Sequence, residues 1–252
     1  KLAIIALCVV AHLSIKKEKT MRKYKVVLFH LDGTLLDSND VWHQVDVEFF
    51  AQRGLELPKD YAKIISPMGF KGAAHYTIEK YNLSETPEQV MAQWHEMAQK
   101  KFANSVSLKP FAKEYLEFLK KSGVRLCIAT ASNEDLFVPS LENNGVFHLF
   151  DSVTTIQEVS RGKGFPDIYL KAAEKNGFLP SDCVVYEDIY EGVRGAKSGG
   201  FYTVAVYDKN SKDDEKIGAL FVKIIKHWKK YGIGFGLEIM MNFELRWSPK
   251  LR

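Results

Sequence analysis

The stretch from Tyr24 to Ser38, YKVVLFHLDGTLLDS, constrains the fold of this chain more than any other segment. Residues Val26–Phe29 form a short apolar run with β-branched side chains, which predicts a buried strand of a parallel sheet. Polar residues begin abruptly at His30 and Asp32, where that strand should end. Ligands of open α/β sheets bind at the carboxyl ends of the strands. An Asp before a glycine is also ordinary turn composition, so Asp32 alone fits a plain turn as well.

Further short apolar runs predict more strands, and two of these also end in polar side chains. Thr130 follows one run, and the adjacent acids Glu187 and Asp188 follow another. Adjacent carboxylates at the end of a buried strand cost free energy unless they bind something. Lys163 lies in a loop ahead of a helix that should begin near Pro166, and a solvated lysine is the simpler interpretation there. The predicted strands are residues 124–129, 152–156, 183–186 and 201–207.

These segments, taken together, resemble the sequence motifs of the haloacid dehalogenase superfamily of phosphatases and phosphomutases. In the first motif, Asp-x-Asp-Gly-Thr, the first Asp is the family's nucleophile and the second its general acid and base. The second Asp corresponds to Asp32, but His30 stands in the nucleophile's place. The other motifs follow in the family's order between residues 24 and about 200, at Thr130, Lys163-x-x-Pro-Asp and Glu187-Asp188.

The resemblance implies a fold and a cofactor. The expected fold is α/β, a three-layer Rossmann-like domain with a mainly parallel sheet and an inserted helical cap domain, as in the family's β-phosphoglucomutase-like branch. By the same resemblance, Thr130, Ala131 and Lys163 hold the phosphate. The implied Mg²⁺ is held by Glu187, Asp188 and the backbone carbonyl of Asp32. The substrate would be a small phosphorylated metabolite, with a sugar phosphate among the candidates.

His30 changes what the resemblance implies for activity. Imidazole replaces both the attacking carboxylate and one anionic oxygen ligand, and Mg²⁺ prefers hard oxygen ligands. We therefore expect a Mg²⁺-dependent phosphatase whose turnover is impaired. The alternatives are a non-catalytic phosphometabolite-binding or regulatory protein, and a sugar-phosphate mutase. A mutase is less well matched, because the histidine that such enzymes carry soon after the first motif corresponds to Trp42 here.

The segment after the first strand is predicted to be mainly helical. Val41, Val45 and Phe49 recur at helical spacing, and Thr86 to Gln89 reads as a capping box with a first-turn proline. Lys71 lies between glycines in an expected loop. In the mutase branch of the family, a basic residue near this point contacts the substrate's second phosphate, whereas a solvated lysine is the simpler interpretation.

The predicted division of the chain has four parts. Residues 1–20 are expected to be a non-native extension ahead of Met21, and residues 217–252 an atypical tail without periodicity. The haloacid dehalogenase-like core comprises residues 21–37 and 108–216, and the helical cap residues 38–107. The apolar run near the amino terminus is too short to span a bilayer, so no membrane contact is expected for the core.

Charge and cysteine content exclude other classes of protein. The net charge of +4 arises from the ends, with +3 in residues 1–20 and +5 in residues 217–252, whereas residues 21–216 carry −4. The body therefore lacks the basic character of a nucleic-acid-binding protein. The 3 cysteines are too few and too scattered for a metal cluster or a disulfide framework. A cytoplasmic, reducing location is expected.

Overall fold

The computed structural model describes residues 24–65, 68–208, 216–217 and 223–225, and the described residues form two compact units. The α/β unit comprises the described residues of 1–36, 108–132 and 146–252, and the helical unit comprises those of 37–107 and 133–145. Residues 133–145 thus group with the helical unit, whereas the sequence predicted them as part of the core. They do so because helix α7 (Glu134–Asn143) packs along α5 (Pro87–Asn104).

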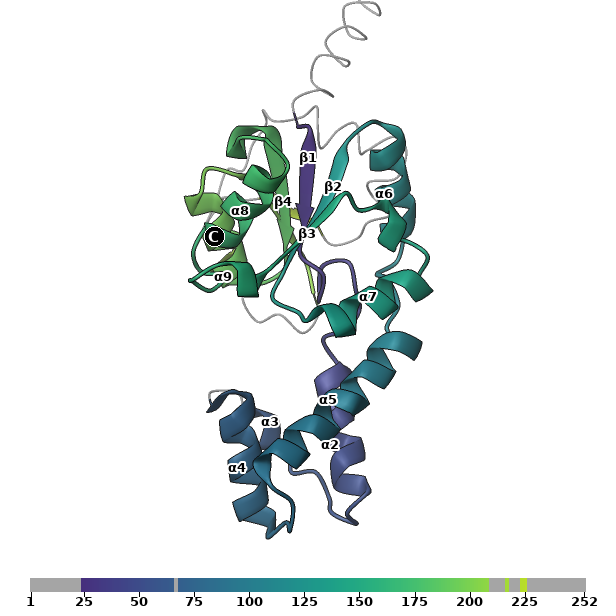
Figure 1. Cartoon of the computed structure of the whole chain (residues 1–252), viewed down its shortest axis with the longest axis vertical. Helices are drawn as coiled ribbons and strands as arrows, with labels where there is room; N and C mark the ends of the chain where they lie inside the picture. The colour runs from purple at the N-terminus through teal and green to yellow at the C-terminus, as the bar shows by residue number, and fades with distance from the viewer. Residues whose placement is uncertain (1–23, 66–67, 209–215, 218–222, 226–252) are drawn as a thin grey trace, which may run out of the picture. The chain divides into compact units, whose positions relative to one another are not determined.

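The α/β unit is built on a parallel sheet of 6 strands in the order β3-β2-β1-β4-β5-β6 (Figure 1). The first five strands confirm the predicted ones to within 1 residue at either end. Within the tail, for which the sequence shows no periodicity, the structure has the short strand β6, which is only 3 residues long. The bounds are β1 (Val26–Phe29), β2 (Arg125–Thr130), β3 (Ser152–Thr155), β4 (Cys183–Glu187), β5 (Tyr202–Val206) and β6 (Lys223–Ile225).

Alternate residues of the central strand face two different helical layers. Val26 and Leu28 belong to a buried cluster with residues of helix α8 (Asp167–Lys175) and helix α9 (Tyr190–Ser198). On the opposite face, the ring of Phe29 stacks on that of Tyr186 at 5.2 Å, and the Tyr186 hydroxyl lies 2.6 Å from the hydroxyl of Tyr115 on helix α6 (Ala112–Lys121). The period of two along a strand therefore produces the predicted three-layer α/β architecture.

Strand register brings the polar strand ends to one edge of the sheet. Phe29 pairs with Ile128 of β2 and with Tyr186 of β4, so the next residues along all three strands emerge at the same level. The His30 N–H continues this register by donating to the Tyr186 carbonyl at 3.0 Å. Gly33 then turns the chain with a φ of +74°, a conformation that glycine adopts without steric cost. The chain leaves this unit at Leu36 and returns at Leu108, and an antiparallel bridge joins these two residues.

The helical unit has an aromatic core. The Phe50 ring meets those of Tyr61 and Tyr81 edge-on, each at 4.9 Å between centroids. The predicted capping box at Thr86 is confirmed, because its hydroxyl accepts from the Gln89 N–H and the Gln89 side chain accepts from the Thr86 N–H. Besides α5 and α7, the helices of this unit are α2 (Val41–Ala51), α3 (Tyr61–Ile65) and α4 (Gly69–Tyr81).

Short 3₁₀ helices lie in the connections of the α/β unit at Phe147–Leu149, Ile156–Glu158 and Pro180–Asp182. No helix in the part of the chain that the structure describes is both long enough and apolar enough to cross a membrane. The predictions for residues 1–20 and for most of the tail lie outside the described residues.

Candidate active site

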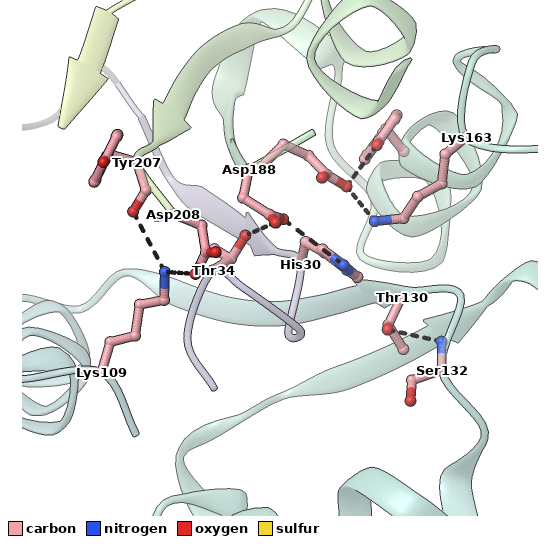
Figure 2. Close-up of polar contacts among 11 residues, drawn as sticks. His30, Thr34, Lys109, Thr130, Ser132, Lys163, Asp188, Tyr207 and Asp208 are labelled. Atoms are coloured by element: carbon pink, nitrogen blue, oxygen red, sulfur yellow. Dashed lines mark hydrogen bonds and ion pairs between the residues drawn. The ribbon is translucent and has the colours of Figure 1, made fainter. Parts of the chain in front are cut away.

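His30, Glu187 and Asp188 form the centre of the site at the carboxyl ends of β1 and β4. One potential ligand atom from each of the three lies within 4.8 Å of the other two, and all three side chains are buried. The Nε2 atom of His30 is 3.9 Å from Oδ1 of Asp188 (Figure 2). His30 directly follows β1, and Glu187 is the last residue of the neighbouring strand β4, so the parallel pairing of these strands brings the three groups together.

Thr34 fixes the orientation of Asp188. Its hydroxyl donates to Oδ1 of Asp188 at 3.0 Å, and neither residue is more than 2% exposed (Figure 2). The tight turn after β1 positions Thr34, because the N–H groups of Thr34 and Leu36 both point to the Leu31 carbonyl. Burial raises the pKa of Asp188 to about 6, although the nearby His30 opposes this effect. At neutral pH Asp188 remains mainly ionised and can serve as a ligand.

Glu187 is held by a cation and a phenol. One carboxylate oxygen, Oε1, accepts from the ammonium of Lys163 and from the hydroxyl of Tyr169, the latter at 2.8 Å. Burial alone would raise the pKa of Glu187, but Lys163, His30 and these hydrogen bonds together lower it below the usual value. Burial, and then the Glu187 charge, raises the pKa of Tyr169 well above that of a free tyrosine. These contacts therefore favour the carboxylate form of Glu187, whose second oxygen, Oε2, has no hydrogen-bond partner among the described residues.

Two glycines on α9 allow this arrangement. A Cβ at Gly192 would lie 2.5 Å from the carboxylate carbon of Glu187, and a Cβ at Gly195 would lie 2.1 Å from the Lys163 carbonyl oxygen. The first turns of α9 can therefore approach the acidic strand end and the Lys163 loop closely only because these positions lack side chains. Lys163 and Glu187 meet because α9 packs against both of the segments that carry them.

The other predicted site residues lie at the same edge of the sheet. Thr130 is the fully buried last residue of β2, and its hydroxyl oxygen accepts from the Ser132 N–H at 3.0 Å, which leaves the hydroxyl proton for another acceptor. Ala131 is exposed just beyond it. Asp32 is half-buried in the turn after His30 and forms a backbone bridge with Leu36. The structure thus assembles six predicted residues from four segments of the α/β unit: His30, Asp32, Thr130, Lys163, Glu187 and Asp188.

Lys71 differs from expectation. The structure places it in the first turn of α4 and not in a loop, and its ammonium lies 4.0 Å from the carboxylate of Glu88. Gly69 has a φ of +67° at the start of this helix, so the glycines that suggested a loop mark a helix start instead. Lys71 belongs to the helical unit and its role in substrate binding remains a prediction.

Sequence reasoning missed three supports of the site. Thr34 belongs to the quoted first motif, yet no pattern links its hydroxyl to Asp188. Tyr169 follows the third motif by two residues and reads only as an apolar residue of α8. Lys109, at the return into the α/β unit, forms a largely buried ion pair of 2.7 Å with Asp208 and also donates to the Tyr207 carbonyl (Figure 2). Such long-range partners have no fixed spacing in a sequence.

The donor set does not suit the Mg²⁺ that the resemblance implies. Mg²⁺ is bound by oxygen ligands in near-octahedral geometry and keeps several waters. The buried carboxylates of Glu187 and Asp188 meet this preference, but one oxygen of Glu187 is already held by Lys163 and Tyr169. The third member of the cluster, His30, offers an imidazole nitrogen, a ligand typical of zinc and other transition metals.

Known proteins resemble this chain over most of its length. CbbY of Rhodobacter capsulatus is 27% identical over 203 residues, which cover 76% of this chain and 88% of that protein. A Drosophila melanogaster protein named "Probable pseudouridine-5'-phosphatase" is 30% identical over 202 residues, which cover 75% of this chain and 84% of that protein.

Solved structures share the fold. CbbY from Rhodobacter sphaeroides superposes with a TM-score of 0.66 at 21% identity, covering 85% of this chain and 99% of that one. A β-phosphoglucomutase from Clostridium difficile gives a TM-score of 0.64 at 15% identity, covering 86% and 97%. The model of the family described as haloacid dehalogenase-like hydrolase matches residues 27–206. The chain therefore belongs to the haloacid dehalogenase-like hydrolases.

Proposed function

We propose that this chain is a phosphatase, a phosphate monoester hydrolase for a small phosphorylated metabolite, and that His30 impairs its turnover. The observation that carries the proposal is the meeting of Lys163, Thr130 and the Glu187–Asp188 pair at one edge of the sheet. Relatives whose names state an activity include the Drosophila protein named "Probable pseudouridine-5'-phosphatase" and a phosphorylated carbohydrates phosphatase of Thermotoga maritima. Both names specify a phosphorylated small molecule.

Two of these residues are suited to hold a transferring phosphoryl group. Lys163 is only 9% exposed, so its ammonium acts in a poorly solvated environment where a charge is more effective. The Thr130 hydroxyl retains a proton that it can donate to a phosphate oxygen. Phosphoryl transfer depends mainly on positioning and charge stabilisation, which these groups supply. Asp32 is the candidate general acid for the leaving oxygen, since it is half-buried beside His30.

The missing part is the nucleophile. A carboxylate at position 30 would attack phosphorus and form an aspartyl phosphate, with the leaving oxygen protonated by Asp32. The imidazole of His30 has a different reach and brings no negative charge to the site. With aspartate in its place, the buried donors would all be carboxylates, which Mg²⁺ prefers. We propose Mg²⁺ as the cofactor of that restored form.

The experiment compares the parent chain with His30→Asp on p-nitrophenyl phosphate in the presence of Mg²⁺. We expect kcat/KM to rise at least about a hundredfold, because removing a nucleophile from an enzyme costs far more than that. His30→Asn is the matched control, since it has the size of aspartate without the attacking oxygen, and we expect no gain from it. Chelation by EDTA should abolish the restored activity. Equal, robust activity of the parent and His30→Asp would overturn the proposal.

A second candidate function is supported by His30 itself. The residues that would hold phosphate are present, and His30 replaces the attacking group, as in a non-catalytic phosphometabolite-binding or regulatory protein. A metabolite screen on both forms separates the two functions. Rescue by His30→Asp supports the phosphatase, and no rescue together with specific binding of one phosphometabolite supports the binding protein. Product analysis with a hexose phosphate tests the mutase.

The location that we propose is the cytoplasm. Cys127 and Cys183, the cysteines within the described residues, are both free and buried. Burial raises the pKa of Cys183 to about 12, so its thiol stays protonated and unreactive. Free thiols on β2 and β4, the strands on either side of β1, are in keeping with a reducing compartment.

A further inference from the structure

We propose that His30, Glu187 and Asp188 bind a divalent transition-metal ion of the zinc class. The proposal concerns metal binding by the parent chain and does not require that it hydrolyse any ester. It therefore goes beyond the proposed phosphatase function, although it concerns the same edge of the sheet.

The spacing of the donor atoms suits a single small ion. Zinc bonds to nitrogen and oxygen are about 2.1 Å long, so two ligands in tetrahedral geometry lie about 3.4 Å apart. His30 Nε2 and Asp188 Oδ1 are 3.9 Å apart, and one donor from each of the three residues falls within 4.8 Å of the others. Small rotations of the side chains would close this cluster around an ion. It is the one group of this kind among the described residues.

Buried atoms without partners give an independent reason to expect a ligand. Glu187 is fully buried, and its Oε2 atom has no hydrogen-bond partner among the described residues. The same holds for Nδ1 of His30, a residue only 7% exposed. A buried polar atom left unsatisfied costs about 1–3 kcal/mol, and a bound cation would offset that cost for the carboxylate oxygen. Lys163 and Tyr169 occupy only the other oxygen of Glu187, so Oε2 can turn to a metal.

Charge and ligand type select the class of ion. Glu187 and Asp188 supply two negative charges, Lys163 supplies one positive charge, and an imidazole that binds a metal adds none. The cluster therefore carries a net negative charge that a divalent cation would offset. One nitrogen and two carboxylate oxygens form a ligand set that zinc accepts with a fourth position open, whereas Mg²⁺ gains little from the imidazole. The competing arrangement is a direct contact between His30 and Asp188, which needs no metal.

The test uses Co²⁺ as a spectroscopic substitute for zinc, added to the full chain and followed by visible absorption and calorimetry. We expect one Co²⁺ per chain in a site from which Zn²⁺ displaces it and an equal concentration of Mg²⁺ does not. His30→Gln and Asp188→Asn should each weaken Zn²⁺ binding at least about tenfold, which corresponds to 1.4 kcal/mol. Circular dichroism checks that each variant is folded. If His30→Gln does not fold, His30→Asp replaces it in this comparison. His30→Asp should also shift the preference toward Mg²⁺.

His95→Ala is the matched control. The Nε2 atom of His95 lies 2.5 Å from the Asp135 carboxylate, so it is also a histidine beside an acid, but it is not part of a three-donor cluster among the described residues. This variant should bind Zn²⁺ as the parent does. Absence of saturable Co²⁺ binding by the parent, or binding that the His30 and Asp188 variants leave unchanged, would overturn the inference. Neither result bears on the gain in phosphatase activity expected from His30→Asp, so the two proposals fail separately.

Discussion

The two units of the molecule bury different kinds of side chain. The α/β unit encloses charged and polar groups at the carboxyl ends of its strands, among them Glu187 at 0% and Asp188 at 2% exposure. The helical unit encloses mainly apolar side chains, among them an aromatic cluster in which Phe50 packs between Tyr61 and Tyr81. Aromatic burial stabilises a fold without further partners, whereas a buried charge destabilises it unless the charge is paired.

This difference indicates that the charged residues of the site lower the stability of the α/β unit. The Lys163–Glu187 pair sits in an environment where two well-packed apolar side chains would serve the fold equally well or better. Its presence is therefore better explained by the chemistry of the site than by stability. In the helical unit, the aromatic core contributes directly to stability. Three substitutions, in order of expected effect, test this contrast.

The largest effect is expected from Lys163→Met. It leaves the buried carboxylate of Glu187 without its cation, which typically costs about 3–5 kcal/mol in the free energy of unfolding. Urea denaturation of the variant and the parent measures this loss. Restored phosphatase activity in the His30→Asp background should also fall, because the phosphate loses its cation.

Lys120→Met is the control for this prediction. Lys120 pairs with Asp151 at 2.8 Å, but both side chains remain about a third exposed, so we expect a loss below about 1 kcal/mol. Adding Glu187→Gln to Lys163→Met should recover much of the stability, since no unpaired charge remains. Equal losses for the two lysine variants would show that burial does not distinguish these pairs.

The parts of the fold and the site that are set by residues close together in the sequence could be predicted. Thr130, Lys163 and the Glu187–Asp188 pair could be placed because each lies at a short, fixed offset from a strand or helix boundary. Parallel pairing then brings strand ends to one edge without further information. The same logic predicted the three-layer fold, since strands and helices alternate along the chain.

The rest depends on side chains that meet across the fold. Tyr169 reaches Glu187 from helix α8, and Thr34 reaches Asp188 across 154 residues of sequence. Helix α7 has an apolar face that would suit the sheet or the helical unit equally well, so its partner α5 could not be chosen from the pattern. The glycines that flank Lys71 predict a loop, whereas the buried Ala73, Ala74 and Thr77 hold that segment as a helix.

A smaller effect is expected from Phe50→Leu in the helical unit. Phe50 is 1% exposed and loses three edge-on ring contacts, together with some buried volume, so we expect a loss of about 2 kcal/mol. Hydrogen exchange of the α4 and α5 amides measures it locally. Phe70→Leu is the matched control, because Phe70 is 43% exposed, and its cost should stay below about 0.5 kcal/mol. Faster exchange in the α/β strands instead of α4 and α5 would contradict the assignment of Phe50 to the core of the helical unit.

The smallest effect is expected from Asp46→Asn, which removes a buried carboxylate from the helical unit. Asp46 is 9% exposed, and burial raises its pKa from 3.8 to about 6, with His43 partly opposing the shift. The folded state therefore holds this proton more tightly than the unfolded chain does. Ionisation of Asp46 lowers the stability of the fold as the pH rises from about 4 to about 6, and the loss persists above that range.

The magnitude and the sign of this effect can be checked together. A shift from about 4 to about 6 corresponds to about 3 kcal/mol in a dry site, and screening by solvent reduces the expected effect to about 1 kcal/mol. Asp46→Asn should therefore unfold at higher urea than the parent at pH 7.5, whereas the two should match at about pH 4, where the destabilising ionisation of Asp46 is largely absent. Asp60→Asn, at an exposed position of the same unit, should show no such difference between the two pH values. A gain of equal size at pH 4 would mean that the amide packs or hydrogen-bonds better than the acid, and that Asp46 is not a buried charge comparable to those of the α/β unit.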